Sequence, residues 1–151
     1  MRSRPEPRRV FLLSPANLSG RRASFLLGPK VQCELGLRLR QDGAPLGEIF
    51  SFVSGLYFRG KLAYANAFSA CAGGSGGSIF IITSGCGLLA PDAHTSCSQL
   101  QRMAETMIHV ANPSYRMPLE RDLAQLVHES PKAMRWSCLA ASPRRNTSIR
   151  S

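Results

Sequence analysis

The sequence predicts one three-layer α/β domain with a mostly parallel sheet. Three observations predict this class. Two short apolar runs, Val10 to Leu13 and Ile79 to Thr83, have the length and composition of buried strands. Helix-like segments lie between and after them, and 151 residues suffice for the core of one domain. We assign residues 10–130 to this domain and residues 1–9 to a basic, disordered N-terminus.

The segment between the two strands is predicted to be mainly helical. Ser14-Pro15 stops the first strand, and Ser19 can cap a helix that continues to Leu27. A second helix is expected from about Val31 to Arg40. A third is indicated by side chains at helical spacing, with Gly55 and Gly60 as expected breaks: Tyr57, Lys61, Tyr64 and Phe68.

Helical signals also dominate the part of the chain after the second strand. Ser96 and Gln99 form a capping box for a helix that reaches Thr106, and Met107 to Ala111 is expected to be a short edge strand. The glycine-rich segment 71–78 precedes a strand, whereas a phosphate loop follows one, so it is interpreted as a flexible connector. The last helix is predicted from an apolar stripe: Leu119, Leu123, Leu126 and Val127.

Residues 131–151 do not continue the α/β pattern and are interpreted as an irregular basic tail. An α/β domain should return to its sheet after the last helix, so the closing strand is expected to be missing. When the stretch from Trp136 is translated in a shifted reading frame, it becomes a buried strand, a Gly-Ser turn and a helix start. We therefore hypothesise that residues from about Arg135 onward are a frameshift product. The intended protein would then continue beyond Ser151, and sequencing of the coding DNA tests this.

The charge is concentrated at the two ends of the chain. The total is +10, with +7 in residues 1–40, −2 in residues 41–130 and +5 in residues 131–151. Sixteen of the nineteen basic residues are arginine, which suits phosphate contacts. This distribution allows a polyanionic partner, but solvated basic tails are the commoner explanation of such charge.

The cysteines and the N-terminal residues give information about the cellular compartment of the protein. Five cysteines without a C-x-x-C pair fit reduced thiols in the cytoplasm. The twin-arginine-like start at Arg8-Arg9 is interrupted by polar residues, and no run approaches the roughly 18 apolar residues of a membrane span, so no membrane partner is expected. Four residues could in principle bind zinc, but their spacing matches no compact zinc-binding pattern: Cys86, His94, Cys97 and His109. Neither a metal nor a cofactor is therefore expected.

Four short pieces, in order, resemble bacterial peroxide-stress YaaA-like proteins and related small α/β domains of unknown function. They are Leu12 to Asn17, Phe58 to Tyr64, Ser84 to Asp92, and the strand read in the shifted frame. The resemblance implies an α/β fold and a connection with DNA binding or protection under oxidative stress. It implies no established reaction. Asn17 and Cys86 depart from the family, which usually has a lysine and a tyrosine there.

Polar side chains follow both predicted strands. Ser14 and Ser84 come directly after them, and ligands of parallel sheets collect at the carboxyl ends of strands. Arg59 and Lys61 could add positive charge there. The set suits a phosphate or nucleotide-like anion, and the alternative is that these are simply turn residues. The remaining candidate residues lie in the same loops: Asn17, Gly85, Cys86, Gly87 and Asp92.

Three functional hypotheses follow. The first is a nucleic-acid- or nucleotide-associated binding domain, with a link to oxidative-stress protection. The second is an enzyme acting on a nucleoside or a phosphorylated small molecule, with Ser84 or Asp92 as catalytic candidates. The third is a truncated product without stable function. Whether the chain is an enzyme stays open, because no G-x-S-x-G elbow places a serine beside a base.

Overall fold

The main sheet has four strands in the order β4-β3-β1-β6. They are β1 (Arg8–Leu13), β3 (Ser78–Thr83), β4 (Gly87–Leu89) and β6 (Met134–Leu139). β1 pairs in parallel with β3 and with β6, and β4 runs antiparallel to β3. The prediction of an α/β fold with a mostly parallel sheet is confirmed. The computed structural model describes residues 8–70, 78–129 and 134–140.

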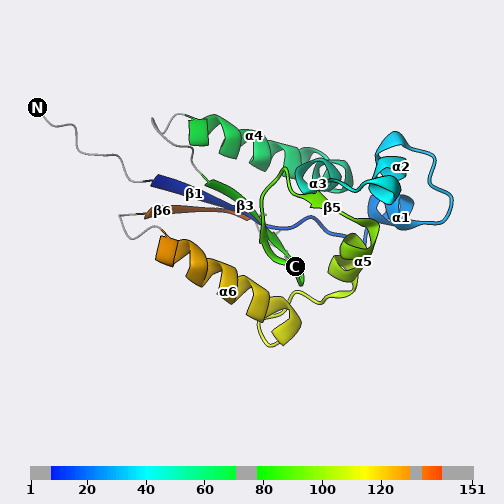
Figure 1. Ribbon diagram of the computed structural model, residues 1–151. Coiled ribbons are helices and arrows are strands. Elements are labelled where there is room, and N and C mark those ends of the chain that lie inside the picture. Colours follow the sequence, from blue (N-terminus) through cyan, green and yellow to red (C-terminus); the bar gives the residue numbers. More distant parts are fainter. Residues whose placement is uncertain (1–7, 71–77, 130–133, 141–151) are drawn as a thin grey trace, which may run out of the picture.

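One long helix covers each face of this sheet (Figure 1), α4 (Leu56–Ala70) and α6 (Pro113–Glu129). Phe11 and Leu13 belong to the core on the α4 side, whereas Val10 and Leu12 belong to the core on the α6 side. This division follows from the alternation of side chains along a strand. The helices contribute Phe58 and Ala65 on one side, and on the other Leu119, Leu123 and Leu126.

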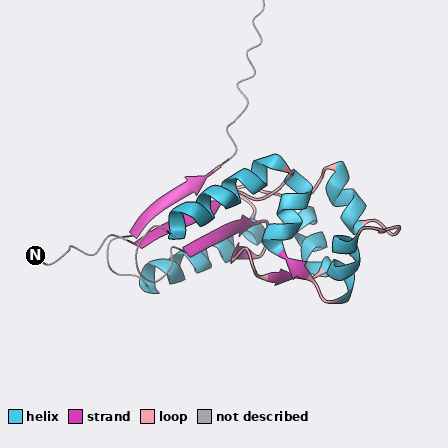
Figure 2. Ribbon diagram, turned by 90° about the horizontal axis from the view of Figure 1, so that it is seen from above, coloured by secondary structure: helices cyan, strands magenta, loops and turns pink. Residues whose placement is uncertain are grey.

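Four shorter helices gather beyond the carboxyl end of β1 (Figures 1 and 2): α1 (Arg21–Leu27), α2 (Glu34–Gln41), α3 (Leu46–Ser54) and α5 (Cys97–Glu105). A small antiparallel pair, β2 (Ala44–Pro45) and β5 (His94–Thr95), joins them. Their buried side chains continue the core of the α4 side, so that this end of the sheet is packed against helices: Leu26, Leu39, Leu46, Ile49, Phe50, Leu100 and Met103.

Local sequence signals explain several boundaries. The Ser96–Gln99 capping box at the start of α5 is confirmed. Gly55 ends α3 at φ 58°, a conformation in which a side chain would be strained, so that expected break is confirmed too. Gly60 lies inside α4, and Gly20 rather than Ser19 precedes α1, so these two predictions are wrong.

The predicted edge strand from Met107 to Ala111 is also wrong. This segment is a loop between α5 and α6, and it leaves Met107, Ile108 and Val110 exposed. α6 instead begins at Pro113, a residue that the first position of a helix tolerates because its N–H would be unpaired there anyway.

The expectation that the closing strand is missing is corrected by β6, which supplies it. Met134–Leu139 lies along the free edge of β1, with Val10 opposite Trp136 and Leu13 opposite Leu139. Within β6 the apolar Met134, Trp136 and Cys138 alternate with the polar Arg135 and Ser137, as in a strand with one apolar face. Residues 141–151 lie outside the described residues.

Two further expectations concern parts of the chain that the structure does not describe. The connector 71–77 lies outside the described residues, as do residues 1–7 of the N-terminal segment, while β1 already begins at Arg8. Among the described residues, no helix is both long enough and apolar enough to cross a membrane.

Candidate functional site

Ser14 directly follows β1, one of the two inner strands of the sheet. Its backbone N–H donates to the carbonyl oxygen of Leu139 at 3.1 Å, which joins Ser14 to the end of β6. Lys61 of α4 reaches it from one face of the sheet, and its Nζ donates to Ser14 Oγ at 2.6 Å and to the Ser14 carbonyl oxygen at 3.2 Å. We call these two residues the Ser14–Lys61 pair.

The surroundings of Lys61 are partly apolar. Its Nζ lies 5.5 Å from the centroid of the buried Phe58 ring, one turn earlier on α4. Burial lowers the pKa of the Lys61 amine below its usual 10.5 because the charged form loses hydration. The amine therefore loses its proton more easily than a lysine on the open surface does.

Asn17 lies in the exposed loop between β1 and α1. Its Oδ1 accepts hydrogen bonds from the backbone N–H of Ser19 at 2.9 Å and from Ser19 Oγ at 2.6 Å. These two bonds form a local turn and fix the direction of the carboxamide. Asn17 thus lies in the same loop as Ser14, and Pro15 and the buried Ala16 separate the two residues in the sequence.

Arg59 and Lys61 do not form a joint cationic cluster. They are two positions apart on α4, and residues at this spacing point to different sides of a helix. Arg59 is exposed, whereas Lys61 is turned toward β1.

Ser84 is buried and tied to another element. It is only 4% exposed, and its Oγ donates to the carbonyl oxygen of Met103 at 2.6 Å. That carbonyl belongs to the last turn of α5, where backbone acceptors need a partner from outside the helix. The Ser84 hydroxyl therefore connects β3 to α5.

Gly85 and Gly87 form the tight turn between β3 and β4, with φ of 93° and 71°. A side chain at Gly87 would collide with the Asp122 carboxylate and with the Pro118 carbonyl of α6. The Asp122 carboxylate also accepts the backbone N–H of Leu88 at 2.9 Å. Gly87 thus allows a close contact with α6, whereas Gly85 allows one with Thr106 at the end of α5.

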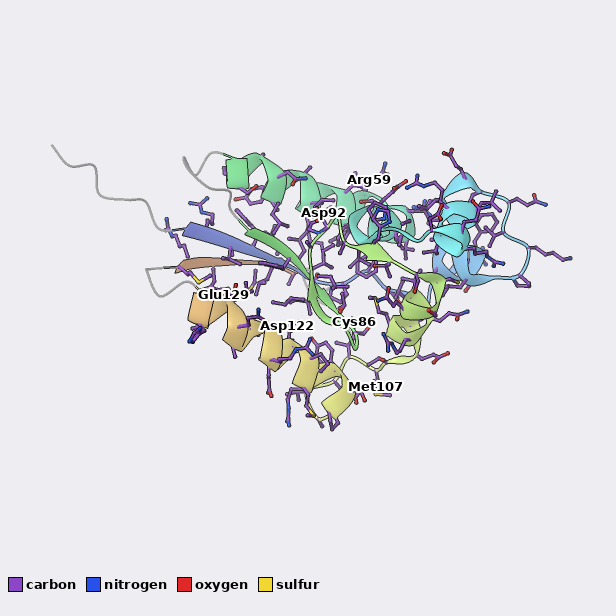
Figure 3. All side chains as sticks on the ribbon, viewed as in Figure 1. Arg59, Cys86, Asp92, Met107, Asp122 and Glu129 are labelled. Carbon is purple, nitrogen blue, oxygen red and sulfur yellow. The ribbon has the colours of Figure 1, made fainter. Side chains whose placement is uncertain are left out.

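Cys86 lies at the tip of the same turn and is a free, half-buried thiol. Its Sγ accepts a long hydrogen bond of 3.8 Å from Arg102 Nη2 of α5. Cys86 packs against the core that contains Leu100 and Met103 of α5, whereas Figure 3 labels Asp122 on α6.

Asp92 lies away from Ser84 because β4 runs antiparallel to β3 and carries the chain back along the sheet. Asp92 is exposed and points to the α4 side in Figure 3. It lines a cavity of about 490 Å³ together with residues of α4, β3 and the segment after β4: Asn66, Ser69, Ile79, Phe80, Ala90 and Pro91.

The structure brings together only some of the residues that the sequence predicts for the binding site. Ser14 and Lys61 are in direct contact, with Asn17 in the adjoining loop, while Ser84, Asp92 and Arg59 lie in three other environments. The carbonyl of Leu139 was not predicted from the sequence, because residues after Pro131 were interpreted as an irregular tail. The alternation of Met134, Trp136 and Cys138 with polar residues was the signal that could have indicated a strand there.

Comparisons with protein-family models, curated proteins and solved structures give no match.

Proposed function

We propose that the protein binds a phosphate-bearing ligand, a nucleotide or a nucleic acid, at the carboxyl end of β1. The observation that carries the proposal is the contact between the Lys61 ammonium and the Ser14 hydroxyl. A cation and a hydroxyl that are already held together provide several hydrogen-bond donors for phosphate oxygens. The end of a parallel strand is also where ligands of α/β sheets collect.

The charge of the chain supports the same class of ligand. The net charge of +10 favours the approach of a polyanion, and Arg59 adds an exposed cation to the helix that carries Lys61. We assign Arg59 to this long-range attraction. Lys61 is assigned to direct contact with phosphate.

Substitution of Lys61 tests the site. Binding of fluorescently labelled ATP and of a short labelled single-stranded DNA is measured by anisotropy for the wild type, Lys61→Met and Lys61→Arg. A hydrogen bond to a charged group contributes about 1.5–3 kcal/mol, so Lys61→Met should weaken binding about 10-fold or more. Lys61→Arg keeps the cation and should keep most of the affinity.

Lys30→Met is the matched control, because it removes one exposed lysine from the loop between α1 and α2. It should change affinity far less than Lys61→Met. Equal effects of the two substitutions would mean that only net charge matters, and this outcome contradicts the proposed site. Arg59→Ala should mainly reduce the dependence of DNA affinity on salt.

A further inference from the structure

The hydroxyl of Ser14 has an amine as its partner, and this distinguishes it from the neighbouring serines. Lys61 Nζ lies 2.6 Å from Ser14 Oγ, within the range over which a base takes a proton from a nucleophile. Ser84 instead donates to a backbone carbonyl, and Ser19 donates to the Asn17 carboxamide oxygen. A carbonyl or carboxamide oxygen is far too weak a base for that role.

We propose that Ser14 is a nucleophile that Lys61 activates as a general base, and that its substrate is an acyl phosphate, a mixed anhydride of a carboxylic acid and phosphoric acid. The phosphate half of this substrate class rests on the proposed function. The reaction at the acyl carbon does not, since it requires only the Ser14–Lys61 pair.

Water is the only further reactant that the reaction needs. Neutral Lys61 Nζ takes the proton of Ser14 Oγ, and Oγ forms a bond to the acyl carbon. The bond between that carbon and the phosphate oxygen breaks, and the Lys61 ammonium gives its proton to the leaving phosphate, which departs as hydrogen phosphate. Water then attacks the acyl-serine ester, neutral Lys61 takes a proton from it, and the Ser14 hydroxyl is restored as the carboxylic acid leaves and releases its proton to solvent.

The surroundings of Lys61 make the proton of its ammonium easier to remove. Burial lowers its pKa, and the elements packed against α4 bring few charges near it. α3 contributes Glu48, which is bonded to Arg38 at 2.8 Å, β3 carries no titratable side chain, and the arginines of β1 are at the opposite end of that strand from Ser14. On α4 itself, Arg59 points to another side, and Tyr57 and Tyr64 flank Lys61 by one turn.

The wild-type protein alone provides a first test. It is incubated with acetyl phosphate and, separately, with para-nitrophenyl acetate, quenched with acid and mapped by peptide mass spectrometry. The acetyl group should be found on Ser14 with both reagents, and not on Ser19 or Ser84. Acetylation of Lys61, or of several serines equally, would overturn the proposal.

Two variants separate this inference from simple anion binding. Lys61→Arg keeps a cation but cannot act as a base, because guanidinium stays protonated. It should slow acetylation of Ser14 about 100-fold or more while retaining nucleotide affinity. Lys61→Met should lose both properties, and Lys30→Met should lose neither. Thermal denaturation of each variant identifies any that fails to fold.

The pH profile adds a readout that a structural role would not change. In the wild type, the rate of Ser14 acetylation should rise with pH and level off below 10.5, as the amine becomes neutral. In Lys61→Met no such plateau is expected. A wild-type rate equal to that of Lys61→Arg at every pH refutes the role of Lys61 as base. Acetylation of Ser14 by para-nitrophenyl acetate without any ATP or DNA binding would refute the proposed function but support the role of Ser14 as a nucleophile.

Discussion

Ser14 and Ser84 both follow strands of the sheet, yet their hydroxyls have different chemistry. Ser14 is half-buried and contacts the Lys61 amine, whereas Ser84 is enclosed and donates to the Met103 carbonyl. The sequence places both at strand ends but does not say which neighbour each hydroxyl finds. That neighbour decides whether the hydroxyl of a serine can react or instead stabilises the fold.

We expect Ser84→Ala to lower stability without changing ligand binding. The substitution leaves the buried carbonyl of Met103 without its donor, which costs about 1–3 kcal/mol. Chemical denaturation measures the free energy of unfolding. Ser114→Ala, at an exposed position of α6, serves as the control and should change this free energy by only a few tenths of a kcal/mol. Lost affinity for ATP at unchanged stability would mean that Ser84 contacts the ligand instead.

At the scale of elements, β6 is the strand whose side chains fit their place least well. Arg135 lies opposite Arg9 on β1, and like charges on paired strands are unfavourable. Trp136 and Cys138 are exposed, and Ser137 lies opposite the buried Phe11 on the face covered by α4. A shifted reading frame, which stays a hypothesis, would replace Trp136 and the residues after it and would leave Arg135 opposite Arg9.

Ser137→Val should therefore stabilise the protein. A β-branched apolar side chain opposite Phe11 adds buried apolar area and strand propensity, with an expected gain of about 1 kcal/mol. The midpoint of urea denaturation reports the change. Ser137→Asp is the paired variant and should lower that midpoint, because it brings a charge to the same face. Similar midpoints for both variants would show that β6 is not packed on the sheet.

At the scale of the molecule, one core joins the sheet to the helices beyond its carboxyl end. Leu13 and Ile81 of the sheet share a hydrophobic cluster with Leu39 of α2, Phe50 of α3 and Met103 of α5. Helices at this end cannot separate from the strands without exposing that cluster to water. The short elements therefore depend on the sheet for their stability, and the sheet depends on them.

A single cooperative unfolding transition is expected for this reason. Trp136 is the only tryptophan and reports on β6 through its fluorescence, while circular dichroism reports mainly on the helices. The two thermal curves should coincide. An earlier change in Trp136 fluorescence would indicate that β6 detaches first. Absence of any cooperative transition would support the hypothesis of a truncated product without stable function.

The sequence alone determined the α/β class, the strand cores at Val10 to Leu13 and Ile79 to Thr83, and the cap of α5. These features depend on local periodicity and on side chains that bond within one turn, so they can be read from neighbouring residues. The alternation along β1 likewise divides its side chains between two faces whatever packs on them.

Only the tertiary structure decided which of the candidate residues meet. The antiparallel course of β4 takes Asp92 away from Ser84, and the packing of α5 encloses the Ser84 hydroxyl. The rotation of α4 turns Lys61 toward Ser14 and leaves Arg59 exposed. The free edge of β1 pairs with Met134–Leu139 and makes it a strand of the sheet. Each outcome depends on contacts between residues far apart in the chain, and the pattern of one segment cannot encode its partner in another.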